Sequence, residues 1–224
     1  MKKVYFLAFL GLFFAPILRG QEYELLTPKL ILKGNLLSVF DPFCPAIGGG
    51  IEYRISDRKS FEHEVGYIYA SPNKIAEGLT GARLRTAFRY YSKDDIGKAT
   101  FIGFQGTYQI LTGELGSFVW RENKKYQQFL RYGNDFRTFD LNVIIGRTFY
   151  LGNSERFYID TYFGFGSSWT TFRYKNLPSD AAIPSLPAWF ADSEPLRSPT
   201  EIYTQRRGSL FWSLKLAYVL RWRF

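Results

Sequence analysis

The sequence predicts an all-β fold: an eight-stranded antiparallel transmembrane β-barrel with long outer loops, preceded by a cleaved signal peptide. Three observations predict it. Apolar and polar residues alternate over most of the chain, short and long connections alternate, and 19% of the residues are aromatic although mean hydropathy is only −0.17. The longest uncharged run after the first twenty residues is Ala99–Gly113, which is shorter than the roughly 20 apolar residues of a membrane-spanning helix. The sequence therefore favours a protein that crosses the membrane with β-strands rather than with helices.

The first twenty residues have the layout of a secretory signal peptide. The basic pair Lys2-Lys3 precedes an apolar run, residues 4–16, that is too short for a transmembrane helix and typical of a signal sequence. We place cleavage after Gly20; an uncleaved membrane anchor is the alternative. The signal peptide is then residues 1–20, and residues 21–224 form a single domain, the barrel.

Period-two alternation is clearest at the C-terminus. From Leu210 to Phe224 every even position is apolar or aromatic, whereas Lys215, Arg221 and Arg223 occupy odd positions. On a strand these two sets face opposite sides, and in a membrane barrel the apolar set faces lipid and the polar set faces the lumen. The same alternation predicts eight strands, at 29–40, 47–55, 61–70, 82–91, 100–111, 136–151, 157–173 and 209–224.

The connections between these strands alternate in length. Short polar turns follow the second, fourth and sixth strands, at 56–60, 92–98 and 152–156. The connections after the fifth and seventh strands are long, at 112–135 and 174–208. Outer-membrane barrels have this asymmetry, with short periplasmic turns and longer outer loops.

Aromatic residues gather at the predicted periplasmic strand ends, where girdles of membrane barrels lie. On the lipid-facing parity these are Phe61, Tyr90, Phe149, Phe157 and Trp222. The chain ends at Phe224, and a terminal aromatic after an alternating strand resembles the signal that barrels present to the barrel-assembly machinery. We therefore expect a place in the outer membrane of a Gram-negative cell. A soluble β-sandwich or lipocalin-like barrel, with its apolar face inside, is the alternative.

The start of the barrel region carries a resemblance. The stretch Leu32-Lys33-Gly34-Asn35-Leu36-Leu37, followed by Gly49-Gly50-Ile51-Glu52-Tyr53-Arg54-Ile55-Ser56-Asp57, resembles the opening of a family of bacterial outer-membrane barrels of unknown function. The resemblance covers about residues 29–69. In architecture alone, the predicted barrel is similar to the eight-stranded barrels of the OmpA and OmpX type, and likeness of fold does not give function.

The inward parity collects charged residues from most strands. They are the basic residues Lys33, Arg54, Arg83, Arg85, Arg89, Lys215, Arg221 and Arg223 and the acidic residues Glu52, Glu62, Glu64, Asp140 and Asp160. An eight-stranded barrel is only wide enough inside for side chains, and unpaired buried charge is costly. We expect a polar network that fills the lumen. A narrow anion-selective pore is the alternative, because basic residues outnumber acidic ones.

A five-residue turn at 56–60 would set the register of the hairpin that it joins. Arg54 would then lie opposite Glu62 and form an ion pair, while Glu52 would lie opposite Glu64. Like charges directly opposed destabilise a sheet. The second pair therefore requires a third group, and Arg89 or an arginine from across the lumen is the natural candidate.

The sequence offers little catalytic chemistry. Some eight-stranded barrels modify lipid with a His, a Ser and an acidic partner, but the single histidine, His63, falls on the lipid-facing parity, and Glu62 and Glu64 point to the other side. A catalytic triad needs a hydrogen-bonded pair of this kind. One His and one Cys, Cys44, make no recognisable metal site. We expect no enzyme, metal or cofactor; a lipid-modifying outer-membrane enzyme is the alternative.

The two long connections carry the candidate binding residues, since exposed apolar residues in outer loops often mark a partner surface. The candidates are Trp120, Lys124, Lys125, Tyr126, Trp189 and Phe190. We expect a structural or ligand-binding protein that contacts outer-membrane lipid and lipopolysaccharide, and through these loops an external glycan or protein. No nucleic acid is expected at that location. Loops that only pack on one another are the alternative.

Overall fold

The structure is a computed structural model that describes residues 30–40, 45–69, 79–93, 98–122, 125–152, 156–178, 180–181 and 203–220. Several features predicted from the sequence lie outside these residues: the signal peptide with its cleavage site, Cys44, Lys124, Trp189, Phe190, Arg221, Trp222, Arg223 and Phe224. Within the described ranges, no helix is long and apolar enough to cross a membrane.

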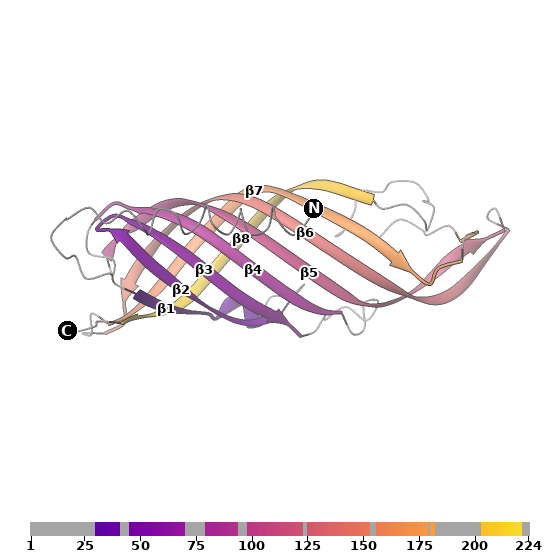
Figure 1. The fold of residues 1–224 in the computed structure, drawn as a ribbon, viewed down its shortest axis with the longest axis horizontal. Coiled ribbons are helices and arrows are strands. Elements are labelled where there is room, and N and C mark those ends of the chain that lie inside the picture. Colours follow the sequence, from indigo (N-terminus) through magenta and orange to yellow (C-terminus); the bar gives the residue numbers. More distant parts are fainter. Residues whose placement is uncertain are drawn as a thin grey trace, which may run out of the picture.

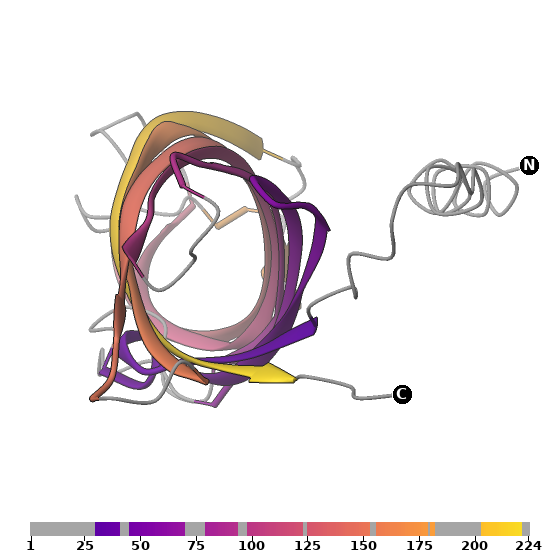
Figure 2. The same cartoon turned by 90° about the vertical axis from the view of Figure 1, so that its left-hand side faces the viewer.

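The described residues form a closed barrel of eight antiparallel strands in chain order (Figures 1 and 2). The strands are β1 Leu30–Asn35, β2 Ala46–Ser56, β3 Lys59–Ile68, β4 Thr80–Tyr91, β5 Thr100–Arg121, β6 Tyr126–Tyr150, β7 Phe157–Lys175 and β8 Tyr203–Leu220. β1 pairs with both β2 and β8, so the sheet closes on itself and each strand has two neighbours. The prediction of an all-β, eight-stranded antiparallel barrel is confirmed, and the architecture is that of small OmpA- and OmpX-type barrels.

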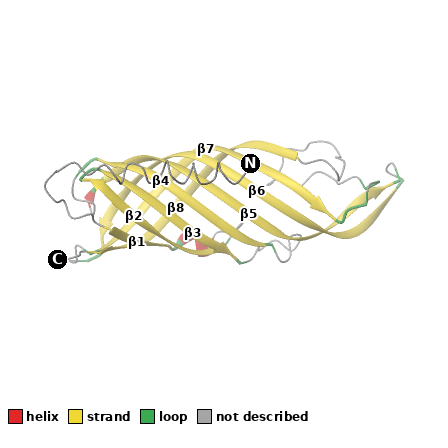
Figure 3. Cartoon of the chain, in the orientation of Figure 1, coloured by secondary structure: helices red, strands yellow, loops and turns green. Residues whose placement is uncertain are grey.

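The two ends of the barrel differ in their connections (Figures 1 and 3). At one end, which we call the short-turn end, lie the β2–β3, β4–β5 and β6–β7 connections together with the start of β1 and the end of β8. The opposite end carries the β5–β6 hairpin, and we call it the hairpin end. The two strands of that hairpin, with 22 and 25 residues, are the longest in the described part of the chain.

The first strand is shorter than predicted. Alternation suggested a strand over 29–40, but β1 ends at Asn35 and a single 3-10 turn, η2 Leu37–Phe40, follows. The Asn35 side chain accepts a hydrogen bond from the Ser38 amide at 3.1 Å, and the Ser38 hydroxyl donates to the Asn35 carbonyl at 3.2 Å. Such side-chain bonds to nearby backbone compete with a ladder, and here they turn the chain out of the sheet.

The predicted outer loop 112–135 is wrong. The β5–β6 ladder runs without interruption from Thr100↔Arg147 to Arg121↔Tyr126, and only a tight connection remains between the strands. Glu122 in that connection has a positive φ of 48°, which is the conformation that a tight turn needs. The predicted loop 174–208 is also too long, because β7 continues to Lys175 and β8 begins at Tyr203.

The predicted register between the second and third strands is also wrong. The turn holds two residues, Asp57 and Arg58, instead of five, and the register shifts between Arg54 and Ser56. A shorter turn moves every pair, because turn geometry fixes hairpin register. Arg54 therefore lies opposite Ser60, Gly50 lies opposite Glu64, and Glu52 lies opposite Glu62. Neither predicted pair forms, and the like-charge contact falls on Glu52 and Glu62.

The strands are steeply tilted around the barrel. Following direct cross-strand partners from Leu32 leads through every strand to Gly208 of β8. Between β1 and β8, direct partners have residue numbers that add to 250, so the register would place Gly208 opposite position 42. A path of direct partners that starts at Leu32 and passes once around the barrel therefore returns ten residues further along the chain. A closed barrel requires this stagger, which accompanies a strand tilt of about 35–45°.

The interior is filled in layers. Near the short-turn end an apolar and aromatic cluster includes Ile31, Tyr91, Phe101 and Tyr158. A second apolar cluster near the hairpin end includes Ile68, Leu111, Phe136, Val119 and Phe172. Buried polar and charged side chains lie between the two clusters. The polar interior expected from the sequence therefore has apolar layers on both sides.

Candidate functional site

Eight charged side chains meet inside the barrel, and we call them the lumen network. They are Lys33, Glu52, Glu62, Glu64, Arg85, Arg89, Asp160 and Lys215. They belong to β1, β2, β3, β4, β7 and β8. Strands on opposite sides of a closed barrel can share contacts only through its interior. The lumen network therefore crosses the lumen.

Glu62 is the centre of the network. Its carboxylate lies 2.9 Å from Lys33 Nζ and 2.7 Å from Arg89 Nη2, and it also forms a salt bridge with Lys215. Lys33 pairs in addition with Glu52, and its Nζ lies 2.5 Å from Asp160 Oδ2. The ammonium of Lys33 thus lies between Glu52 and Glu62 and offsets the repulsion of these directly opposed carboxylates.

Charges in the lumen network are balanced and almost fully removed from water. Four cations face four carboxylates, and every one of these side chains is buried except that of Arg85, which is partly exposed. Aromatic rings surround the group: the Arg89 guanidinium lies 4.4 Å from the Phe101 ring centre, and the Tyr91 hydroxyl donates to Glu52 at 2.6 Å. Removal of ions from water costs several kcal/mol for each ion unless partners and hydrogen bonds offset it, and the partners here do so.

Three carboxylates of the network, from Glu52, Glu62 and Asp160, lie within 4.8 Å of one another. Three such oxygens could hold a hard cation. Lys33 Nζ, however, pairs with all three of them. The protein's own ammonium group therefore takes the position that a metal ion would need.

Of the other predicted lumen residues, Arg54, Arg83 and Asp140 lie inside the barrel. The Arg54 guanidinium lies over the Tyr91 ring at 5.9 Å. Arg83 Nε donates to Gln109 Oε1 at 2.9 Å, closer to the hairpin end. Asp140 is half-buried on β6. Arg221 and Arg223 lie outside the described residues.

His63 lies on the outer wall of β3. Its Nδ1 is 3.1 Å from the hydroxyl of Thr86, its direct partner on β4. Glu62 and Glu64, its neighbours in sequence, are buried on the inner side. His63 therefore has no carboxylate partner in the described contacts, and these residues do not build a catalytic triad.

The β5–β6 hairpin extends beyond its neighbours. The β4–β5 ladder ends at Thr80↔Thr112, and the β6–β7 ladder ends at Gly133↔Lys175. Within the described part of the chain, residues 113–121 and 126–132 consequently pair only with each other, and we call them the projecting ribbon (Figure 1, at the far right). Three predicted binding residues lie in the ribbon or at its turn rather than in a loop: Trp120, Lys125 and Tyr126.

The two faces of the projecting ribbon differ. On one face Val119 and Tyr132 are buried in the apolar cluster that also contains Ala181. Arg121 Nε donates to Asp180 Oδ2 at 2.8 Å, and this hydrogen bond holds the pKa of the Asp180 carboxyl below its usual value. The other face exposes Phe118 and Phe129, whose rings meet edge to face at 5.4 Å.

Sequence reasoning missed this aromatic pair and the inner apolar layers. Phe118 and Phe129 are separated by a charged turn, and only their register, Phe118↔Phe129, places them together. Phe101 and Ile144 share the inward parity with polar residues further along their strands. Their position near the strand ends was the available signal.

Comparisons of the chain with models of known protein families, with curated proteins and with solved structures found no match. The resemblance of residues 29–69 to a family of barrels of unknown function thus has no support from a family model. An architecture shared with many barrels does not define a function. Arguments about function therefore rest on this chain's own surfaces.

Proposed function

We propose that this chain is a non-enzymatic outer-membrane β-barrel with a closed lumen, whose projecting ribbon binds a ligand or partner outside the cell. The observation that carries the proposal is the outer wall. Large apolar side chains point outward all around the barrel, with exposed fractions of up to 82% at Leu210 and 68% at Phe104. Soluble proteins rarely expose a continuous apolar surface of this extent.

The height of the apolar wall supports a membrane location. On β5 the exposed apolar residues run from Ile102 to Ile110. Toward the hairpin end they are followed on the same face by the polar residues Thr112 and Glu114. Nine residues at about 3.3 Å each, tilted by about 40°, span about 23 Å. The apolar band of outer-membrane barrels is about 25 Å tall. In this orientation the short-turn end lies in the periplasm and the projecting ribbon lies outside the cell.

A closed lumen is favoured over an anion-selective pore. Lys33 of β1 contacts Asp160 of β7, and Lys215 of β8 contacts Glu64 of β3 at 2.5 Å. These contacts join strands that are not neighbours in the sheet, and they lie between two apolar layers. Equal numbers of cations and carboxylates in the lumen network leave no excess positive charge there to select anions.

The projecting ribbon is the favoured binding surface. Phe118 and Phe129 are exposed on a two-stranded scaffold, and Tyr126 is exposed beside its turn. Exposed aromatic residues on such a scaffold suit an external glycan or protein. We further propose lipopolysaccharide and membrane lipid as partners of the outer wall, and the barrel-assembly machinery as the partner of the C-terminus.

Cell fractionation tests the location directly. We expect the protein in the outer-membrane fraction, with a folded form that migrates differently from the heated form in detergent gels. Recovery as a soluble secreted protein would contradict the proposal. In planar lipid bilayers the purified barrel should show no steady conductance, and a stable anion current would favour the pore instead.

A mass spectrum of lipid A distinguishes the proposed binding function from the alternative, a lipid-modifying enzyme. Cells that produce the protein and cells that produce the variant His63→Ala should give the same lipid A masses, because the described side-chain hydrogen bond of His63 is to Thr86 and not to a carboxylate. The matched control is Thr86→Ala, which removes the same hydrogen bond. A lipid A species that disappears only with His63→Ala would establish an enzyme.

A further inference from the structure

A groove crosses the outer wall of β4–β7, and the row of residues along its floor continues onto β8. Direct cross-strand partners place Thr86, Gly106, Leu141, Ser167 and Gly208 in a single outward-facing row. Four of these five residues are small, and Leu141 is the only large side chain among them. This row therefore forms the floor of a groove, if the rows on each side carry large side chains.

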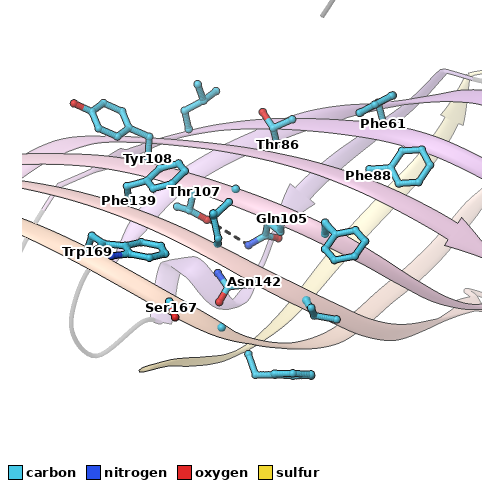
Figure 4. Close-up of a pocket in the computed structure, with 17 residues that line it drawn as sticks. Phe61, Thr86, Phe88, Gln105, Thr107, Tyr108, Phe139, Asn142, Ser167 and Trp169 are labelled. Atoms are coloured by element: carbon cyan, nitrogen blue, oxygen red, sulfur yellow. Dashed lines mark hydrogen bonds between the residues drawn. The ribbon is translucent and has the colours of Figure 1, made fainter. Parts of the chain in front are cut away.

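Both flanking rows do carry large side chains. On the hairpin side the row is Leu84, Tyr108, Phe139 and Trp169, and on the short-turn side it is Phe88, Phe104, Val143 and Phe165. The resulting depression has a volume of about 700 Å³ and a mostly apolar lining. Figure 4 shows Tyr108, Phe139 and Trp169 at one side of it and Phe61 and Phe88 at the other.

The row along the groove floor rises toward the hairpin end as it passes from β4 to β8, because the strands are staggered. Thr86 lies five residues from the short-turn end of its strand, whereas Gly208 lies twelve residues from the corresponding end of β8. The upper end of the groove therefore reaches the level where outward-facing residues change from apolar to polar. On β8 this change falls between Leu210 and Arg206.

An arginine contacts two residues that line that upper end. Arg206 pairs directly with Trp169, its guanidinium lies 5.7 Å from the Trp169 ring centre, and its Nη2 donates to Ser167 Oγ at 3.4 Å. A second exposed arginine, Arg137, precedes Phe139 on the outward parity of β6. Arg137 and Arg206 flank β7, about two strand spacings or 10 Å apart across the sheet.

We propose that this groove binds one lipid of the surrounding leaflet, with an acyl chain along Gly106 and a phosphate monoester headgroup on Arg206. This inference rests on the proposed membrane location. An apolar groove fits an acyl chain, and a guanidinium held by an aromatic ring and a hydroxyl presents paired donors to a phosphate. Arg137 adds positive charge beside the same position. The bound lipid is thereby distinguished from the bulk bilayer by its headgroup.

Quenching of Trp169 fluorescence tests the proposal. The full-length barrel is inserted into phosphatidylcholine vesicles that contain a small fraction of either phosphatidic acid or phosphatidylcholine with brominated acyl chains. The Trp169 signal is the difference between the protein and its Trp169→Phe variant. We expect phosphatidic acid to reach half-maximal quenching at about a tenfold lower fraction, as charge-assisted hydrogen bonds imply.

Three variants test which residues bind the headgroup and the acyl chain. Arg206→Gln should abolish the preference for phosphatidic acid, and Gly106→Leu should weaken quenching by both lipids, because a side chain there enters open space with only Leu141 Cδ2 nearby, at 3.9 Å. Arg147→Gln is the matched control: its guanidinium also lies over a ring, that of Phe149 at 5.1 Å, but at the short-turn end. It should behave like the unchanged protein.

The possible outcomes separate this inference from the proposed function. Equal quenching by the two lipids in an inserted, heat-modifiable barrel would overturn the lipid site and leave the membrane location standing. An equal loss of preference in Arg147→Gln and Arg206→Gln would also overturn it, as would displacement of the brominated lipid by inorganic phosphate alone. Failure of the barrel to insert into vesicles at all would overturn both.

Discussion

The lumen network and the projecting ribbon are both held by ion pairs of good geometry, yet their surroundings differ. Lys33 and Asp160 lie 2.5 Å apart with side chains that are at most 1% exposed, whereas Arg121 and Asp180 lie 2.8 Å apart with side chains that are 19% and 41% exposed. Surface pairs contribute little to stability, while loss of one partner of a buried pair is costly. Surroundings rather than distance therefore decide what each pair contributes.

The largest effect is expected at the centre of the lumen network. Glu62→Gln leaves Lys33, Arg89 and Lys215 facing one carboxylate fewer in a buried site. We expect the free energy of unfolding to fall by about 3–5 kcal/mol, measured by urea titration of the detergent-solubilised barrel. The matched control, Glu114→Gln on the exposed side of the ribbon, should leave it unchanged. Equal effects of the two variants would contradict the contrast between the regions.

A double variant tests whether a buried carboxylate that has lost its cation causes the loss of stability. Lys33→Met alone removes the ammonium that pairs with Glu52 and leaves this carboxylate with the hydrogen bond that the Tyr91 hydroxyl donates at 2.6 Å. Removing both charges, as Lys33→Met with Glu52→Gln, should restore about 0.5–3 kcal/mol of the stability lost in the single variant. The same urea titration measures this difference. A double variant that is less stable than Lys33→Met would show that the pair is not a unit.

An intermediate effect is expected from the exposed aromatic pair. Phe118→Ala removes the edge-to-face contact with Phe129 and should cost about 0.5–1.5 kcal/mol. Phe129→Ala should cost a similar amount, and the double variant should cost less than the sum of the two, because both remove the same contact. Strict additivity in the urea titration would contradict this coupling.

The smallest effect is expected from pH at the ribbon. Arg121 holds the pKa of Asp180 below its usual value, so this contact contributes above the ordinary aspartate pKa of about 4 and is lost only as pH falls through the lower folded value. The Glu122 amide, 3.4 Å from Asp180 Oδ2, should report this titration in NMR spectra. An Asp180 midpoint above the ordinary value would contradict it. The Asp180→Asn variant should show no such transition.

The sequence was sufficient for the strand number and for the faces of most strands, because period-two alternation depends only on neighbours along the chain. It was not sufficient for the register of β2 and β3, where a two-residue turn replaced the expected five. Nor did it reveal the full length of β5 and β6, since the inward residues change from polar ones such as Gln105 to apolar ones such as Val119. The expectation that one face of a strand keeps the same polarity along its whole length is wrong for these two strands.

The sequence likewise predicted one part of the candidate site and not another. The sequence named the charged residues of the lumen network, but not their partners, because Lys33 and Asp160 are 127 positions apart and meet only across the closed barrel. The groove was invisible for a related reason. Thr86, Gly106 and Ser167 form a row only through three successive registers. Spacing within one strand carries no information about that alignment.

The lumen network also bears on how the barrel forms. Its contacts join the first strand to the seventh, through Lys33 and Asp160, and the last strand to the third, through Lys215 and Glu62. A curved sheet that has not yet closed leaves these two pairs apart and hydrated, so they form only when β8 meets β1. The part of the network's energy that depends on these pairs therefore arrives in the final step of closure. Once closed, the seam between the first and last strands is locked from inside, and it opens only when several buried ion pairs separate together.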